Sequence, residues 1–216
     1  MRGMPEVDFT VWEARFARFL DAQSSGDAAH DDAHIARVVA NARRIAAAEG
    51  ANLAVVLPAA WLHDCVTVPK LSPKRSRASR MAADVAVAWL REAGYPPEHL
   101  DAIHHAIAAH SWSARIPPET LEAKTVQDAD RLDALGAIGI ARTLSLNGAY
   151  GLPLYHPSEP FPTTRPPDDR AYAIDHFYAK LLTLAETMQT ATGRAEARAR
   201  TAFMRDYLAQ LAREIT

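Results

Sequence analysis

Two side chains that bind metals stand next to each other at the end of an apolar run. The run is residues 59–62, and His63 and Asp64 follow it. An ionised aspartate at the end of an apolar helix is costly unless another group pairs with it. A divalent metal suits this role, because imidazole and carboxylate together bind manganese, iron, cobalt, nickel or zinc. One His-Asp pair is common by chance, so the prediction depends on further ligands elsewhere in the chain.

Two further residues complete a ligand set. His34 lies on the preceding predicted helix, and Asp130 lies in the acidic cluster of residues 127–133. With His63 and Asp64 they supply two neutral nitrogens and two carboxylates. Such a set holds one divalent ion with a net charge near zero and leaves positions for water and substrate. Adjacent helical residues point about 100° apart, so His63 and Asp64 reach one ion only near the end of their helix.

Each of these ligands also has an ordinary structural alternative. His34 can be a partly buried helix histidine paired with Asp31. Asp130 can cap a helix or pair with the neighbouring arginine, and Asp128 is the position most easily confused with it. His30 lies one turn before His34, and we expect it, like Asp128, to hold a ligand in place rather than to bind the metal.

Helices must position these residues. Apolar residues recur at helical spacing along most of the chain, and no segment shows the alternation of a strand. We therefore predict the all-α class, with Pro58 as a kink or late start in the third helix. The helices are expected at residues 9–20, 30–49, 53–64, 79–93, 97–110, 117–130, 132–146, 170–188 and 194–215.

Two irregular segments interrupt the helices. Residues 66–80 contain two prolines and five basic residues, and we expect a basic loop over a site, although a charge run is usually a solvated surface. Residues 148–168 hold six of the fourteen prolines. So long an irregular loop is usually functional or disordered, and its role stays open.

Composition limits the class of protein. The length of 216 residues suits one domain with its own core. We predict a single domain over 1–216, with a core at about 28–146, the proline-rich loop at 148–168 and C-terminal helices at 170–215. The net charge of −2 argues against a nucleic-acid binder that relies on bulk positive charge.

Cellular location follows from similar observations. Cys65 is the single cysteine, so no internal disulfide can form, which fits a reducing cytosol. The N-terminus has no apolar signal region, and no stretch of about 18 apolar residues occurs. We expect a cytoplasmic monomer or homodimer without membrane or nucleic-acid partners.

The pattern of a histidine, a His-Asp pair and a distant aspartate resembles the HD-domain superfamily of metal-dependent phosphohydrolases. The resemblance is closer to the bacterial branch typified by the YedJ and YpgQ proteins, and it runs from about residue 28 to the C-terminus. The segments that carry it are HDDAHIARV (30–38), AWLHD (60–64), AHSW (109–112), PETLEAK (118–124), QDADRLDALGAIGIAR (127–142) and HFYAKL (176–181). Trp61 and Cys65, which flank the His-Asp pair, depart from the aliphatic residues common there.

The resemblance implies an all-α HD helical bundle with one metal held by His34, His63, Asp64 and Asp130. It implies hydrolysis of phosphate esters or anhydrides. In this branch it points to pyrophosphohydrolysis of nucleoside or deoxynucleoside triphosphates with Mn²⁺ favoured, while Mg²⁺, Co²⁺, Ni²⁺ or Fe²⁺ also suit the ligands.

This chemistry assigns expected roles to further residues. A metal neutralises phosphoryl oxygens and lowers the pKa of its water, and Asp64 or Asp133 could orient that water. His110 is expected near the site as a further catalytic residue. Arginine and lysine bind phosphate oxygens. The phosphate contacts are expected among Arg37, Lys70, Lys74, Arg75 and Arg77.

Other functions share these features. A nucleotidase or phosphomonoesterase of the same fold would release orthophosphate instead. A di-iron oxygenase on the HD fold would need extra ligands, which His104, His105 and His110 could supply. A non-enzymatic nucleotide sensor would not need an open metal site, and the complete ligand set argues against it.

Overall fold

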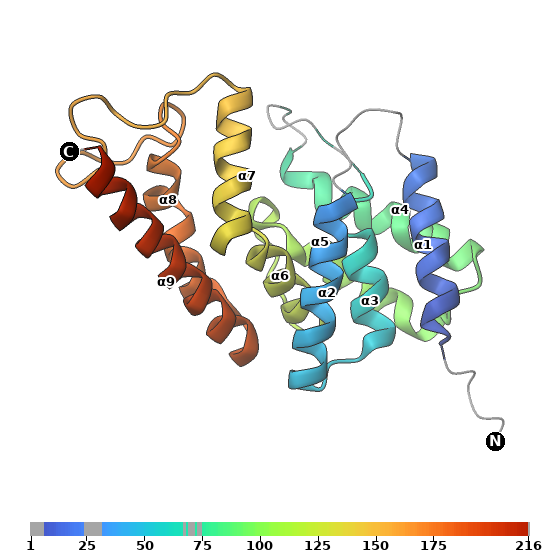
Figure 1. Ribbon diagram of the computed structural model, residues 1–216. Helices are drawn as coiled ribbons and strands as arrows, with labels where there is room; N and C mark the ends of the chain where they lie inside the picture. Colours follow the sequence, from blue (N-terminus) through green and yellow to red (C-terminus); the bar gives the residue numbers. More distant parts are fainter. Residues whose placement is uncertain (1–6, 24–31, 67, 69–71, 73–74, 216) are drawn as a thin grey trace. The chain divides into compact units, whose positions relative to one another are not determined.

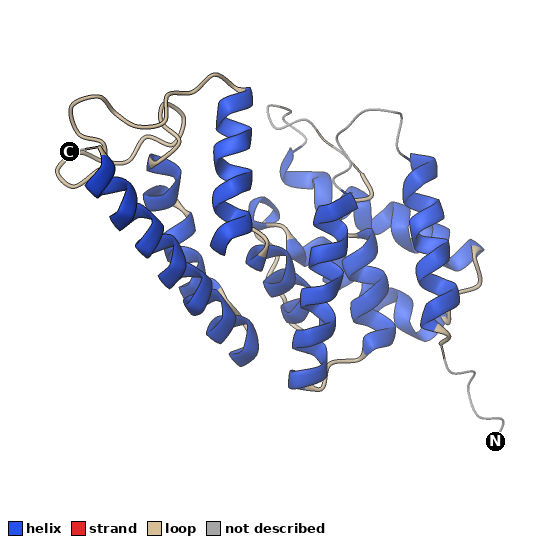
Figure 2. Ribbon diagram, in the orientation of Figure 1, coloured by secondary structure: helices blue, strands red, loops and turns tan. Residues whose placement is uncertain are grey.

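The computed structural model describes residues 7–23, 32–66, 68, 72 and 75–215, and leaves the side chain of Arg75 undescribed. These residues form α-helices and short 3-10 helices without any strand, so the predicted all-α class is confirmed (Figure 2). The chain divides into two compact units, Met1–Asp130 and Arg131–Thr216. The single domain over 1–216 stays a prediction. In the described part of the chain no helix has the length and apolar character needed to cross a membrane.

The first unit is built around one short helix that is apolar on all sides. This is α3, Leu53–Leu62, in which nearly every residue is buried. A helix without a polar face needs neighbours all round, and α3 packs against α1, α2, α4 and α5 (Figure 1). The unit also contains α1 (Phe9–Gln23), α2 (Asp32–Glu49), η1 (Arg75–Arg77), α4 (Ala78–Glu92), η2 (Pro97–His99), α5 (Leu100–His110), η3 (Trp112–Ala114) and α6, Leu121–Leu132, up to Asp130.

The ends of α3 are defined by local interactions. Asn52 caps the N-terminus, because its side chain accepts a hydrogen bond from the Ala54 amide. Pro58 lies inside the helix, where its missing N–H costs a hydrogen bond. The helix ends at Leu62, so His63 and Asp64 directly follow it and lie near the helix end, where both side chains can reach one ion.

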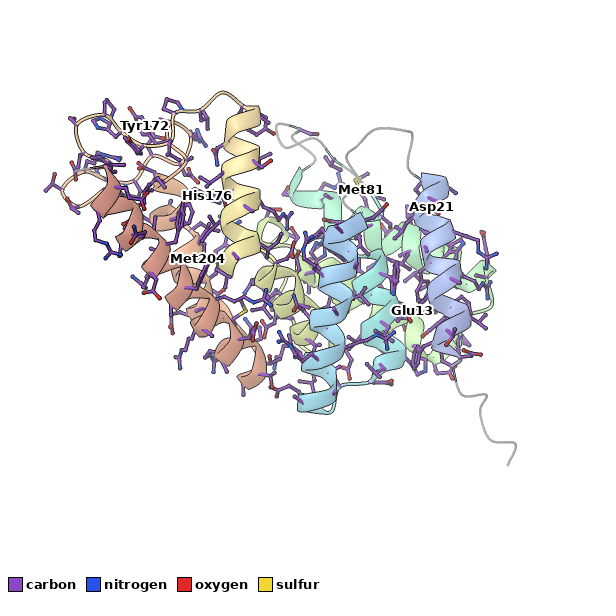
Figure 3. All side chains as sticks on the ribbon, viewed as in Figure 1. Glu13, Asp21, Met81, Tyr172, His176 and Met204 are labelled. Atoms are coloured by element: carbon purple, nitrogen blue, oxygen red, sulfur yellow. The ribbon has the colours of Figure 1, made fainter. Side chains whose placement is uncertain are left out.

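Trp61 connects α3 to its neighbours by a polar contact. Its indole Nε1 donates to Glu13 on α1 at 3.0 Å, and the same carboxylate pairs with Arg43 on α2 at 2.6 Å (Glu13 is labelled in Figure 3). Trp12 and Phe16 bury the apolar face of α1 beside this network. The tryptophan that departs from the usual HD pattern therefore holds the first helix.

The second unit contains α7 (Gly136–Ala149), α8 (Asp175–Ala179), η4 (Leu181–Thr187) and α9 (Ala191–Glu214). The long helix α9 packs against α7 and η4, and Met204, labelled in Figure 3, lies on its buried side. The helix predicted over 170–188 was wrong: it is divided into α8 and η4, because Lys180 leaves the helical conformation at φ −141° and ψ −57°.

Two expected helix starts also differ from the structure. The stretch predicted from residue 117 begins as α6 at Leu121, where the hydroxyl of Thr120 accepts from the Ala123 amide. The helix expected from residue 79 begins as α4 at Ala78, so Ser79 lies inside it, and its hydroxyl donates to the carbonyl of Ala108 on α5. At α7, a Cβ on Gly139 would meet the Ala134 carbonyl oxygen at 2.2 Å, so this glycine admits a backbone approach that no other residue allows.

The proline-rich loop has defined internal structure. The amides of Ala173 and Ile174 donate to the carbonyls of Pro153 and Leu154. The carboxylate of Glu159 accepts hydrogen bonds from the backbone amides and hydroxyls of two neighbouring threonines. These amides lower the pKa of Glu159 to about 2.

An ion pair joins this loop to α8. The guanidinium of Arg165 contacts both carboxylate oxygens of Asp175, at 2.8 Å for the longer of the two contacts, and it also donates to the Glu159 carbonyl. Asp175 is fully buried. Burial opposes its charge, but the hydrogen bonds from Arg165 and from the Asp168 amide outweigh this and lower the pKa of Asp175.

We predict that Arg165→Met lowers the melting temperature by several degrees at pH 7, because the buried Asp175 charge loses its partner. The lowered pKa means that the ion pair stabilises the fold above the ordinary value of 3.8 and loses this effect as pH falls below it. The difference between wild type and variant should therefore shrink between pH 5 and about pH 3. Thermal melts would measure it, with the exposed Arg170→Met as the control. An equal difference at both pH values would contradict the assignment.

Candidate metal centre

His63 is the central residue of the candidate site. Its side chain is fully buried directly after α3, and its Nδ1 lies 2.9 Å from the carbonyl oxygen of Ala60. A carbonyl can only accept, so Nδ1 carries the hydrogen and the lone pair of Nε2 is left for a metal. The apolar end of α3 thus delivers one nitrogen ligand in a defined tautomer.

Two other helices bring ligands to this nitrogen. His34 on α2 places its Nε2 3.3 Å from Nε2 of His63. Asp130 on α6 places Oδ1 3.5 Å from Nε2 of His34 and 3.8 Å from Nε2 of His63. Potential ligand atoms of these three residues all lie within 4.8 Å of one another, so one ion can reach all three.

Asp64 and His110 form a second group around the same histidine. Oδ2 of Asp64 lies 3.8 Å from Nε2 of His63, and Oδ1 of Asp64 lies 3.5 Å from Nε2 of His110. The rings of His63 and His110 meet edge to face at 4.8 Å. The Asp64 side chain is 52% exposed, whereas that of His110 is almost completely buried. The four predicted ligands therefore converge at His63, with His110 beside them.

The charges of the site favour metal binding. Burial lowers the pKa of His63 and keeps its imidazole neutral. Loss of solvation in the surrounding protein raises the pKa of Asp64. The interactions with His63 and His110 outweigh this effect and lower the pKa of the carboxyl group. Neutral imidazole and ionised carboxylate are the forms that bind a divalent ion. For His110, burial is opposed by the hydrogen bond and charge of Asp64, so its pKa is raised.

Several predicted residues lie elsewhere or cannot be placed. Asp128 is fully buried in α6, and Arg37 is half-buried on α2, one turn after His34. Asp133 belongs to the second unit, where its fully buried carboxylate pairs with Arg142. Arg77 is exposed in η1. The residues outside the described part are His30, Lys70 and Lys74, together with the side chain of Arg75.

The histidine cluster of α5 separates into different environments. His104 pairs with Asp84 at 2.9 Å, and Nε2 of His105 accepts from the Glu119 amide at 3.0 Å. Only His110, of these three histidines, joins the candidate site. The sequence assigned no role to Gln127, although its amide donates to the Ala109 carbonyl next to His110. Its only signal was its place at the start of the acidic cluster.

We predict that Asp130→Asn weakens Mn²⁺ binding by about a hundredfold, because it removes a charged ligand from a group that otherwise has two neutral nitrogens. Calorimetric titration of metal-free protein would measure the affinity. Asp84→Asn is the matched control, since this exposed aspartate also pairs with a histidine but lies outside both ligand groups. Equal affinity in the Asp130 variant and the control would remove Asp130 from the ligand set.

Known proteins share the sequence pattern of this chain. Residues 32–135 match the family model of the HD domain. The chain is 36% identical over 200 residues to the uncharacterized protein YpgQ of Bacillus subtilis (strain 168). The aligned region covers 91% of this chain and 88% of that protein.

Solved structures extend the similarity to the fold. An HD-superfamily hydrolase from Bacillus thuringiensis is 32% identical with a TM-score of 0.71, over 94% of this chain and 97% of that one. Bacillus subtilis YpgQ, solved in complex with ADP, is 34% identical with a TM-score of 0.71, over 94% of this chain and 96% of that one. The chain therefore belongs to the HD-domain superfamily of metal-dependent phosphohydrolases, in the branch that includes YpgQ.

Proposed function

We propose that this protein hydrolyses nucleoside or deoxynucleoside triphosphates to the monophosphate and pyrophosphate, with a divalent metal. The observation that carries the proposal is the convergence of His34, His110 and two aspartates around the buried imidazole of His63. The solved complex of the relative YpgQ with ADP supports a nucleotide as the ligand.

His34, His63, Asp64 and Asp130 are the residues that would hold the metal, and their two nitrogens and two carboxylates suit Mn²⁺ as well as Mg²⁺, Co²⁺, Ni²⁺ or Fe²⁺. When bound, a divalent ion supplies charge neutralisation on phosphoryl oxygens and lowers the pKa of water. The fit rests on the neutral Nε2 of His63 and the lowered pKa of Asp64, which leave both ligands in their binding forms.

The protein supplies orientation and a proton. Hydrolysis forms a bond between a water oxygen and the α-phosphorus and breaks the bond from that phosphorus to the bridging oxygen. Pyrophosphate leaves more easily when the bridging oxygen receives a proton. We assign this proton to Nε2 of His110, because Nδ1 donates to the Ile107 carbonyl at 2.7 Å and Asp64 raises the pKa of the ring. We assign the orientation of the water to Asp64, whose side chain is partly exposed.

We assign the binding of the phosphates to two basic residues on elements close to the ligands in the sequence or in the fold. Arg37 lies on α2 one turn after His34. Arg77 lies in η1, which packs against η3, the turn that follows His110. Arginine pairs two phosphate oxygens at once, which favours both residues over a point charge. Asp133 has no role in this proposal, because its buried carboxylate is already engaged by Arg142.

We predict that metal-stripped protein restored with Mn²⁺ converts a deoxynucleoside triphosphate into monophosphate and pyrophosphate. Phosphorus-31 NMR separates these products from orthophosphate. Protein without added metal and the Asp64→Ala variant are the controls, and both should be inactive. Orthophosphate alone, from triphosphates or monophosphates, would assign the protein as a nucleotidase or phosphatase.

The group of His63, Asp64 and His110 could also hold a metal, but it shares Nε2 of His63 with the first group. A di-iron oxygenase on this fold would therefore need a further ligand in place of His63. His104 and His105 do not join that group. Two irons per chain with a spectrum that changes under O₂, and no phosphate product, would favour the oxygenase. Tight nucleotide binding without turnover in any metal would favour a sensor.

We predict that His110→Gln lowers kcat about a hundredfold while the affinity for Mn²⁺ changes less than about threefold, since general acids typically contribute ~10²–10⁴-fold. Steady-state kinetics and calorimetry measure the two quantities on the same preparation. His104→Gln is the control from the same helix and should retain full kcat. A loss of metal affinity as large as that of kcat would instead make His110 a metal ligand.

A further inference from the structure

The last turn of α5 is held by side chains from three helices. The helix ends at His110, so its final carbonyl groups lack donors within the helix. Ile107 O lies 2.7 Å from Nδ1 of His110. Ala108 O accepts from the hydroxyl of Ser79 on α4 at 2.9 Å. Ala109 O accepts from the amide nitrogen of Gln127 on α6 at 2.7 Å.

The contacts made by Ser79 and Gln127 come from buried polar groups. Ser79 is 2% exposed and Gln127 is 3% exposed. Burying a hydroxyl or an amide costs free energy, and one hydrogen bond recovers only part of it. The Gln127 side chain recovers still less, because its Oε1 has no partner in the described part of the chain. Alanine or methionine would fill the same space without burying a polar side chain, so packing alone does not account for Ser79 and Gln127. What they add is a donor for each of two carbonyls at the end of α5.

Both contacts end on the residues directly before His110. The carbonyls of Ala109 and Ala108 lie one and two peptide units before it, and the chain leaves the helix at Ser111 with φ −77° and ψ 129°. The ends of helices fray readily. The hydrogen bonds from α4 and α6 to two successive carbonyls restrain this turn, which carries the imidazole whose Nε2 lies 3.5 Å from Oδ1 of Asp64.

We propose that Ser79 and Gln127 are positioning residues for His110. Their hydrogen bonds from α4 and α6 fix the end of α5 and thereby determine the position of the imidazole relative to Asp64. This inference rests on the proposed function, in which His110 supplies the proton. Neither residue touches substrate in this assignment, and their effect on the reaction passes through His110. A misplacement of about 1 Å is enough to slow catalysis by up to ~10².

A double-mutant cycle separates this role from a merely structural one. Ser79→Ala should lower kcat by about fivefold to tenfold in the wild-type background, with KM changed less than about twofold. In the His110→Gln background the same substitution should change kcat by less than about twofold, because no imidazole remains to be positioned. Equal loss of kcat in both backgrounds would overturn the inference.

Gln127→Met provides an independent test from the other helix, since methionine has a similar length and no donor. It should show the same dependence on His110. Thr125→Val is the matched control: Thr125 lies on the same helix, is fully buried, and its hydroxyl has no hydrogen-bond partner in the described residues. This variant should retain kcat in both backgrounds, and a loss as large as that of Gln127→Met would assign the effect to disturbed packing of α6.

Amide hydrogen exchange of metal-free protein gives a readout that does not depend on activity. Ser79→Ala and Gln127→Met should accelerate exchange in residues 107–111 by about tenfold, while Thr125→Val leaves it unchanged. Unchanged exchange in both test variants would overturn the inference. If His110→Gln itself retains full kcat, the proton-donor role in the proposed function fails as well. If His110→Gln lowers kcat as predicted but Ser79→Ala lowers kcat equally in both backgrounds, the proposed function stands and only this inference fails.

Discussion

The imidazole of His63 has no contact with solvent, and its Nδ1 is committed to the carbonyl of Ala60. Both facts follow from its place directly after an apolar helix. Burial keeps the ring neutral, and the backbone acceptor directs its lone pair to the point where the other ligands meet. His34, Asp130, Asp64 and His110 are all arranged around that one nitrogen.

The same constraint explains the architecture of the first unit. A helix that is apolar on every side must be enclosed by other helices, and enclosure brings residues distant in sequence to its end. α2 contributes His34, α5 contributes His110, and α6 contributes Asp130. Polar contacts add to this packing: Ser79 and Gln127 donate to carbonyls at the end of α5, and Trp61 on α3 donates to Glu13 on α1. The site is thus a consequence of how a short apolar helix is packed.

The second unit uses charge where the first uses apolar packing. Its proline-rich loop contains few regular hydrogen bonds, because proline lacks an amide donor. Arg165 and Glu159 replace them, one by pairing with the buried Asp175 and the other by accepting from successive amides. These interactions stabilise the loop despite its length. Its stability depends on pH, whereas that of an apolar core does not.

Sequence alone determined the helical class and the family, because each depends on local information: apolar spacing and short motifs such as the His-Asp pair after an apolar run. It also predicted the types of the metal ligands, and that a metal bound by both His63 and Asp64 would lie near the end of the third helix. Tertiary structure decided which residues meet. It separated His110 from His104 and His105, although all three lie on α5, because only His110 lies at the helix end that faces Asp64. Tertiary structure also pairs Asp133 with Arg142 and brings Ser79 and Gln127 into hydrogen-bond contact with carbonyls of α5. Hydrogen bonds between distant segments depend on helix packing, and packing has no signature in the spacing of one segment.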